Sequence, residues 1–297
     1  MGIKEWIIPM SDIAFYNKGF LRHDEAFTLV EDRGNNFGDG VYDVVCCFNK
    51  KPFNLDKHLS RFFKSMAMIH INSPYTKKQI KDIIFQATEK TDLNDFLVYF
   101  QITRGCAKRS HVYKDGMASN FYLVVREKHT YEQYRKVGGA PIISVIDDRW
   151  MRCDIKSLNL LANTLAAKKA SMVGCIEAIL IRNGIAAECT SSNIFYIKDG
   201  TLFTEPLSPL ILSGVNRGCV IEIAKRMKIP VIEKQSILQE FYDADEVFMT
   251  SATKLILNVI KIDDSFINKK HPISDMLYDA YVSDVISKCG FIDKTKI

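Results

Sequence analysis

RWMRCDIKSLNLL, residues 149–161, places a single lysine, Lys156, at the junction between an apolar segment that favours a β-strand and a segment that favours a helix. The neighbours Ile155, Leu158 and Leu160 are apolar, so they keep water from the ammonium group. We therefore expect the pKa of Lys156 to fall toward that of a nucleophilic amine, which forms Schiff bases with carbonyl compounds. The more common arrangement is a lysine whose aliphatic stem lies on apolar surface while its ammonium group stays in water. Other parts of the sequence are therefore needed to choose between a reactive and an ordinary lysine.

The composition describes a globular chain without an obvious macromolecular partner. Its 297 residues, 47% of them hydrophobic, suffice for two modest domains. Forty Lys and Arg against 35 Asp and Glu leave a net charge of +5 without a long basic block, so neither nucleic acid nor a membrane is needed to explain the charge, and small anionic substrates are compatible with it. The N-terminal apolar run is too short for a signal peptide and no later run reaches membrane-spanning length, which predicts a soluble, cytoplasmic protein.

The eight cysteines do not indicate a metal site. No C-x-x-C pair occurs, and no histidine stands beside a cysteine at metal-ligand spacing. We expect these cysteines to be small buried side chains in a reducing compartment, and we expect no metal.

The first half of the chain mixes helices and strands. Thr76 and Gln79 form a capping box ahead of a helix. Charged and polar residues dominate 127–136, which predicts an α+β domain over residues 1–128 followed by a linker at 129–135. The other elements expected are strands at 40–48, 96–103 and 120–126 and a helix at 55–69.

The second half, residues 136–297, reads as a larger domain of strands and helices. Asn183-Gly184 and Asp199-Gly200 are dipeptides suited to type I′ hairpin turns. Ser213 is expected to cap a helix that begins at Val215, and Ser236 with Gln239 is expected to form a capping box. The remaining elements are a strand ending at 146, a helix at 158–172, a strand at 246–250 and a final helix after Pro272.

A reactive lysine amine needs an electron sink to do chemistry at the Cα of an amino acid, and pyridoxal phosphate is such a sink. Its site requires a Schiff-base lysine, an acid that faces the pyridine nitrogen, and an anion site for the phosphate. Glu188 follows small apolar residues and precedes a hydroxyl-rich turn, so it is a candidate for the acid. The alternative is a surface glutamate on a strand.

Three segments could bind the phosphate. The helix that opens at 212–217 presents free N–H groups at its positive end, and residues 251–253 follow a strand and could add backbone donors. Arg61, one residue off the apolar stripe of its helix, could pair with the phosphate through its guanidinium fork. These features also have interpretations that involve no ligand. The helix start can be an ordinary capped helix, and Arg61 can be a solvated arginine.

Two loops could meet the substrate. The glycine-rich segment 31–42 fits neither G-x-G-x-x-G nor the Walker A spacing, so we expect it to shape a tight loop that leads into a strand and presents Tyr42. Arg109 and His111 stand two residues apart in a predicted loop, where they could converge on a carboxylate or simply be solvated.

Taken together, the order of these segments resembles the D-amino-acid branch of the pyridoxal-phosphate aminotransferases of fold type IV. That family also contains branched-chain aminotransferases and aminodeoxychorismate lyases. The resemblance runs from about Tyr16 to Asn268, and its most specific segments are 31–45, 99–105, 149–161, 177–200 and 211–217.

The resemblance implies a two-domain α+β fold of type IV, with a small N-terminal domain and a larger pyridoxal-phosphate domain of mixed sheet or barrel and helices. It implies that Lys156 forms the Schiff base and shuttles a proton as general acid and base, and that Glu188 pairs with the pyridine nitrogen. The phosphate ligands implied are Arg61 and backbone N–H groups of Val215, Asn216 and Ala252. A family member used for comparison has threonines at the last two positions, so we expect weaker cofactor affinity here.

By the same resemblance, Tyr42, Arg109 and His111 bind the substrate carboxylate, and Arg109 and His111 come from the neighbouring subunit of a homodimer. The reaction implied is D-alanine with 2-oxoglutarate giving pyruvate and D-glutamate. The alternatives are an L-branched-chain or (R)-amine transaminase, an aminodeoxychorismate lyase, or a binding protein that kept the fold after its chemistry decayed.

Overall fold

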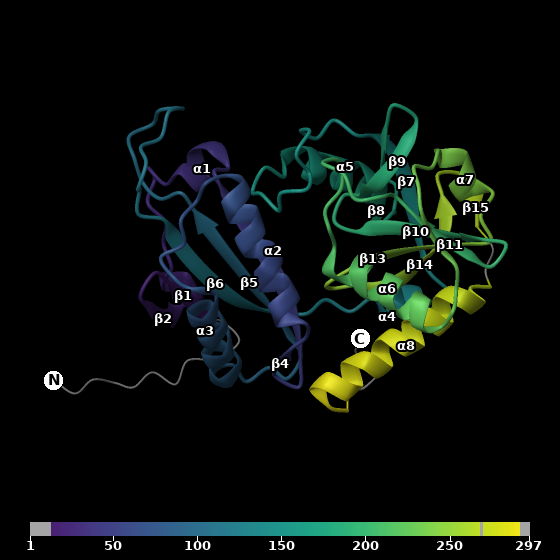
Figure 1. Ribbon diagram of the computed structural model, residues 1–297, viewed down its shortest axis with the longest axis horizontal. Helices are drawn as coiled ribbons and strands as arrows, with labels where there is room; N and C mark the ends of the chain where they lie inside the picture. Colours follow the sequence, from purple (N-terminus) through teal and green to yellow (C-terminus); the bar gives the residue numbers. More distant parts are fainter. Residues whose placement is uncertain (1–12, 268–269, 292–297) are drawn as a thin grey trace. The chain divides into compact units, whose positions relative to one another are not determined.

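The computed structural model describes residues 13–267 and 270–291 and contains two β-sheets in two compact units (Figure 1). Of the described residues, the first unit comprises 13–128 together with Lys156–Asn159, and the second comprises His129–Ile155, 160–267 and 270–291. Helices and strands alternate in both units, which confirms the predicted α+β class. Within the described ranges, no helix is both long and apolar enough to cross a membrane.

The first unit is built on a six-stranded antiparallel sheet with the order β2-β1-β6-β5-β3-β4. The strands predicted at 40–48 and 96–103 are confirmed as β3 and β5, which pair with Tyr42 opposite Gln101. The elements of this unit are β1 (Ile13–Tyr16), β2 (Gly19–Arg22), η1 (His23–Glu25), α1 (Arg33–Phe37), β3 (Gly40–Phe48), β4 (Lys51–Pro52), α2 (Leu55–Met68), α3 (Lys77–Lys90), β5 (Phe96–Thr103) and β6 (Asn120–Glu127).

Helix α2 covers one face of this sheet and leaves Tyr42 on the other. Phe62 of α2 is fully buried and meets the Phe100 ring of β5 edge-on, with 5.0 Å between ring centres. Phe100 lies opposite Asp43 in the β3–β5 ladder, and side chains alternate along a strand, so Asp43 faces α2 while Tyr42 faces away from it. The predicted capping box of α3 is confirmed, since the Gln79 backbone N–H donates to Thr76 Oγ1 and the Thr76 N–H donates to Gln79 Oε1.

The second unit contains a nine-stranded mixed sheet with the order β12-β11-β10-β13-β14-β7-β8-β9, with β15 paired to β14. The predicted hairpin turns are confirmed, with positive φ at Asn183, Gly184, Asp199 and Gly200. Its elements are α4 (Glu132–Lys136), β7 (Ala140–Ile146), α5 (Leu161–Met172), β8 (Glu177–Arg182), β9 (Ile185–Cys189), β10 (Asn193–Lys198), β11 (Thr201–Thr204), α6 (Val215–Arg226), β12 (Val231–Glu233), α7 (Leu238–Tyr242), β13 (Glu246–Ser251), β14 (Leu255–Ile262), β15 (Ser265–Phe266) and α8 (Pro272–Cys289).

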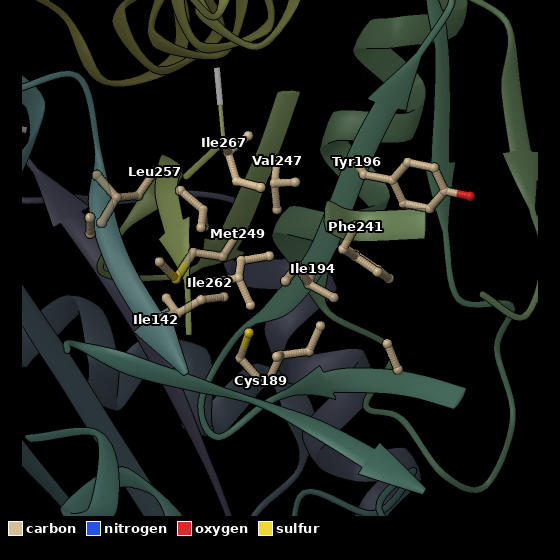
Figure 2. Close-up of a cluster of buried hydrophobic side chains, with 14 residues drawn as sticks. Ile142, Cys189, Ile194, Tyr196, Phe241, Val247, Met249, Leu257, Ile262 and Ile267 are labelled. Carbon is tan, nitrogen blue, oxygen red and sulfur yellow. The ribbon is translucent and has the colours of Figure 1, made fainter. Parts of the chain in front are cut away.

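Buried apolar side chains from six strands and α7 form the core of this unit (Figure 2). Figure 2 shows Met249 of β13 and Ile262 of β14 close to Ile142 of β7, and each of these residues is fully buried. This packing fixes β9 and β13. Glu188 lies on the first of these strands, and Ala252 follows the second.

Two predicted helix caps and two predicted helix starts are wrong. The N-cap of α6 is Gly214 rather than Ser213, and a Cβ atom at position 214 would collide with the Asn193 side chain. Helix α7 starts one residue later than predicted, because Ser236 Oγ lies 3.1 Å from the Tyr196 hydroxyl instead of capping the helix. Helix α5 begins at Leu161 rather than Leu158, because the preceding segment pairs with β3.

Candidate active site

Lys156 is held next to Tyr42 by backbone pairing with β3. The Tyr42 N–H donates to the Lys156 carbonyl oxygen at 3.0 Å, and the Leu158 N–H donates to the Gly40 carbonyl oxygen at 3.0 Å. The Lys156 N–H also donates to Ser65 Oγ of α2 at 3.2 Å. This backbone leaves the half-buried lysine with its Nζ atom 4.3 Å from the centre of the Tyr42 ring. The structure therefore brings together the predicted nucleophile and one predicted substrate residue.

The glycine-rich loop before β3 is shaped as expected. Gly38 ends α1 in the left-handed region with φ 64°, and its carbonyl oxygen accepts from Asn159 Nδ2 at 3.2 Å. A Cβ atom at position 38 would strain this turn and would lie 2.9 Å from Asn159 Oδ1, so the position favours glycine. The loop thus helps to seat the Lys156 segment.

Arg61 is fixed by a buried carboxylate that the sequence reading missed. Its Nε donates to Asp43 Oδ2 at 2.9 Å and its Nη2 to Asp43 Oδ1 at 2.8 Å, while His58 Nδ1 lies 2.9 Å from Asp43 Oδ1. Burial alone would raise the pKa of Asp43, but the charge of Arg61 and the contacts with His58 outweigh burial and hold this pKa well below its usual range. Asp43 therefore stays ionised and sets the orientation of the guanidinium.

His58 completes this cluster as a buried imidazole, 3% exposed. Burial lowers its pKa, and the positive charges of Arg61 and Lys156 lower it further, although Asp43 acts in the opposite direction. A signal for this cluster exists in the sequence, since Asp43 is the one charged residue in the strand GVYDVVCCF and needs a buried partner.

Glu188 is 5% exposed and accepts hydrogen bonds on both carboxylate oxygens. Arg149 Nη1 donates to Oε1 at 2.6 Å, Asn193 Nδ2 donates to Oε2 at 3.0 Å, and the Leu212 N–H donates to Oε2 at 3.1 Å. These donors stabilise the ionised form of the carboxylate.

Arg149, which the sequence reading did not single out, is itself held in place. Its Nε and Nη2 donate to the two oxygens of Asp147 at 2.9 and 3.0 Å. Burial lowers the pKa of Arg149, but the hydrogen bonds that it donates to Asp147 and the charge of Glu188 outweigh burial and raise this pKa overall. The result is a permanently charged arginine between two carboxylates.

The predicted anion-binding segments meet at the start of α6. Val215 and Asn216 are the first two residues of this helix, and Asn216 Nδ2 donates to the Ser251 carbonyl oxygen at 2.6 Å. Ser251 ends β13 and precedes Ala252. The Asn216 side chain thus joins the N-terminus of α6 to the turn after β13, and backbone N–H groups of both are the donors that an anion site needs.

Arg109 and His111 lie in an exposed loop and approach the same ring. The Arg109 Cζ atom lies 5.1 Å from the centre of the Phe37 ring, and the His111 ring lies 5.6 Å from it in an edge-on arrangement. Within the described part of the chain, no hydrogen bond or ring contact joins Tyr42 to either residue. The structure brings two of the three predicted carboxylate ligands together and leaves the third beside Lys156.

Comparison with known proteins assigns the class. The family model of class IV amino-transferases matches residues 40–262, so the chain belongs to the class IV aminotransferases, which depend on pyridoxal phosphate. The predicted family and fold type are confirmed.

Individual relatives cover nearly the whole chain. It is 39% identical over 285 residues to the D-alanine aminotransferase of Listeria monocytogenes serotype 4b (strain F2365), covering 94% of this chain and 98% of the relative. It is 37% identical over 259 residues to the D-alanine aminotransferase of Bacillus licheniformis, covering 86% and 90%. The solved structure of the branched-chain aminotransferase from the archaeon Thermoproteus uzoniensis with norvaline is similar at 25% identity, a TM-score of 0.84 and coverage of 93% and 95%.

Proposed function

We propose that this chain transfers the amino group of a D-amino acid such as D-alanine to 2-oxoglutarate, giving pyruvate and D-glutamate. The placement of Lys156 beside Tyr42 carries the proposal, because it sets the reactive amine next to a predicted substrate ligand. The identities of 39% and 37% with D-alanine aminotransferases support the choice of substrate.

The residues available fit pyridoxal phosphate chemically. When bound, this cofactor supplies the electron sink for bond cleavage at the substrate Cα. Lys156 would bind it covalently and then carry the proton removed from Cα. Glu188, kept ionised by Arg149, would accept a hydrogen bond from the protonated pyridine nitrogen. Its contacts favour the charged carboxylate that this role requires.

The phosphate would be bound by Arg61 and by backbone N–H groups. Arg61 is already aligned by Asp43, so little rotamer freedom is lost when it binds an anion. Val215, Asn216 and Ala252 would add their N–H groups. Because the Asn216 side chain is used by the Ser251 carbonyl and Ala252 has no hydroxyl, the phosphate would receive few side-chain donors from these two positions.

We also propose a homodimer in which Tyr42 and the neighbouring subunit's loop together bind the substrate carboxylate. Arg109 and His111 are exposed and lie on one aromatic ring, which suits two cationic or polar groups that converge on a carboxylate. The two compact units would be the small and large domains of each subunit. Six of the eight cysteines are buried, which supports a cytoplasmic enzyme.

The test is a half-reaction without an acceptor, run in parallel with D-alanine, L-alanine and L-leucine. We expect that, of these amino acids, only D-alanine changes the visible absorption of the enzyme with bound pyridoxal phosphate to the absorption of the aminated cofactor. The same reaction should release pyruvate. Conversion by L-alanine or L-leucine instead would favour the branched-chain activity named for the Thermoproteus relative. Pyruvate release from aminodeoxychorismate without an amino acceptor would instead indicate the lyase alternative.

Arg109→Ala tests the substrate loop, with Lys108→Ala as the matched exposed neighbour. Loss of a charge-assisted contact to a carboxylate should raise KM for D-alanine by about tenfold or more. Lys108→Ala should leave it unchanged. Unchanged D-alanine kinetics in Arg109→Ala would remove Arg109 from the carboxylate site.

A further inference from the structure

Arg33 donates hydrogen bonds to the backbone of the loop that carries Arg109 and His111. It is 4% exposed, at the start of α1, and its Nη1 donates to the Ser110 carbonyl oxygen at 2.6 Å and its Nη2 to the His111 carbonyl oxygen at 3.3 Å. Its Nε donates to Asp39 Oδ2 at 2.7 Å. One buried guanidinium therefore connects α1, the end of the glycine-rich loop and the two residues that follow Arg109.

The same short helix also supports the side chains of the loop. Phe37 lies one helical turn after Arg33, and the Arg33 Cζ atom is 4.6 Å from the centre of its ring. Arg109 and His111 approach this same ring at 5.1 and 5.6 Å. Thus α1 contacts the backbone of the loop through Arg33 and its functional side chains through Phe37.

Arg104 has a different role although it shares Asp39 with Arg33. Its Nε donates to Asp39 Oδ2 at 2.8 Å, but its Nη1 and Nη2 donate to the carbonyl oxygens of His70 and Ile69 at 3.0 and 2.7 Å. Those carbonyls lie just after α2. Of the two buried arginines on Asp39, Arg33 is the one that holds residues 110 and 111.

These contacts depend on the geometry of arginine. A guanidinium donates in fixed directions to several acceptors at once, whereas a lysine ammonium at the same place cannot reach Asp39 and both carbonyls together. A change from Arg33 to lysine therefore keeps the positive charge beside Asp39 and removes the contacts with the loop.

We propose that Arg33 is a positioning residue for substrate recognition, which holds the 109–111 loop so that Arg109 and His111 present their side chains to the substrate carboxylate. This inference rests on the proposed function of that loop. Helix α1 contributes no residue that binds the substrate, but through Arg33 it would control the affinity for both the amino acid and the oxo acid.

The experiment compares Arg33→Lys with the wild type in steady-state kinetics and in limited trypsin digestion. Looser placement of the carboxylate ligands should raise KM for D-alanine and for 2-oxoglutarate by about tenfold, with kcat changed by less than about twofold and the cofactor absorption unchanged. Trypsin should cleave the variant faster after Lys108 and Arg109, since the loop backbone has lost its anchor.

Arg135→Lys is the matched control. Arg135 also donates through Nη1 and Nη2 to two backbone carbonyls, those of Ile256 and Lys254 at 2.8 and 2.7 Å, but in the second unit. It should leave both KM values and the cleavage of the 108–109 site unchanged. An equal rise in KM in this control would overturn the inference, because it would show a general effect of loosening the fold.

Phe37→Leu provides a second arm in case Arg33→Lys folds poorly, and it should raise the same KM values with the same absorption spectrum. Unchanged KM values and cleavage rates in Arg33→Lys, alongside a raised KM in Arg109→Ala, would overturn the inference and leave the proposed function standing. Absence of any D-alanine activity in the wild type would instead refute the proposed function. The trypsin result would then decide separately whether Arg33 anchors the loop.

Discussion

The Nζ atom of Lys156 lies 4.3 Å from the centre of the Tyr42 ring, although the two residues are far apart in the sequence. Their proximity follows from the backbone of the 156–159 segment, which pairs with the first residues of β3 and is bound to α2 through Ser65. A lysine on the following helix would be free to turn away. Fixing the backbone on both sides restricts the amine to one region beside the sheet.

Asp43→Asn should destabilise the protein and weaken its cofactor binding. The substitution leaves Arg61 without its buried counter-charge, which costs about 3 kcal/mol of unfolding free energy and frees the guanidinium to turn. Denaturant unfolding and cofactor titration measure the two effects. Asp56→Asn is the control, since its ion pair with Lys81 is exposed and worth about 0.5 kcal/mol. Equal losses in both variants would contradict the role given to Asp43.

His58 should make the protein less stable in mild acid. Its pKa lies below the ordinary value of 6.5, so the unfolded chain binds this proton more readily than the folded chain does. The stability contributed by the neutral imidazole is therefore complete above about pH 6.5 and is lost as the pH falls through the folded pKa. His58→Gln should flatten the fall in unfolding free energy between about pH 7 and pH 5, whereas a change of the exposed His23 to glutamine should not. Identical pH profiles in wild type and His58→Gln would be evidence against this account.

Mixed dimers should reveal whether the substrate loop acts on the neighbouring subunit. Lys156→Ala and Arg109→Ala are each expected to reduce activity on D-alanine, the first by at least about a thousandfold. A heterodimer of one Lys156→Ala chain and one Arg109→Ala chain can be isolated with two different affinity tags. If the loop acts on the neighbouring subunit, one of its two sites combines the wild-type Lys156 of the Arg109→Ala chain with the wild-type loop of the Lys156→Ala chain. This heterodimer should recover about half of the wild-type kcat with the wild-type KM, because one of its two sites is intact. A heterodimer with the high KM of Arg109→Ala would place the loop in its own subunit's site.

Local sequence patterns predicted most of the fold because hydrophobic alternation and turn dipeptides are local signals. The strands at 40–48 and 96–103 and the hairpin turns at Asn183-Gly184 and Asp199-Gly200 match the structure. The N-caps of α6 and α7 were predicted wrongly, because the local sequence does not show what a residue near a helix start contacts in the folded chain. Ser236 contacts Tyr196, and Asn193 leaves room only for Gly214 at the start of α6.

For the site, sequence reasoning found residues but not their partners. Lys156, Glu188 and Arg61 stand out by local context or resemblance, whereas Asp43 and Arg149, which hold two of them, depend on pairing across the fold. The same holds for Arg33, whose acceptors are the carbonyls of a loop more than seventy positions away. Backbone carbonyls carry no sequence signature, so such a contact becomes visible only in the folded chain.

Reductive trapping of Lys156 tests the central claim most directly. The purified protein is incubated with pyridoxal phosphate, reduced with borohydride, digested and analysed by mass spectrometry. The account predicts loss of the visible absorption on reduction and a single modified peptide that carries the phosphopyridoxyl group on Lys156, with no modification in Lys156→Ala. A protein that stays colourless and unmodified, or one modified equally in Lys156→Ala, would contradict it.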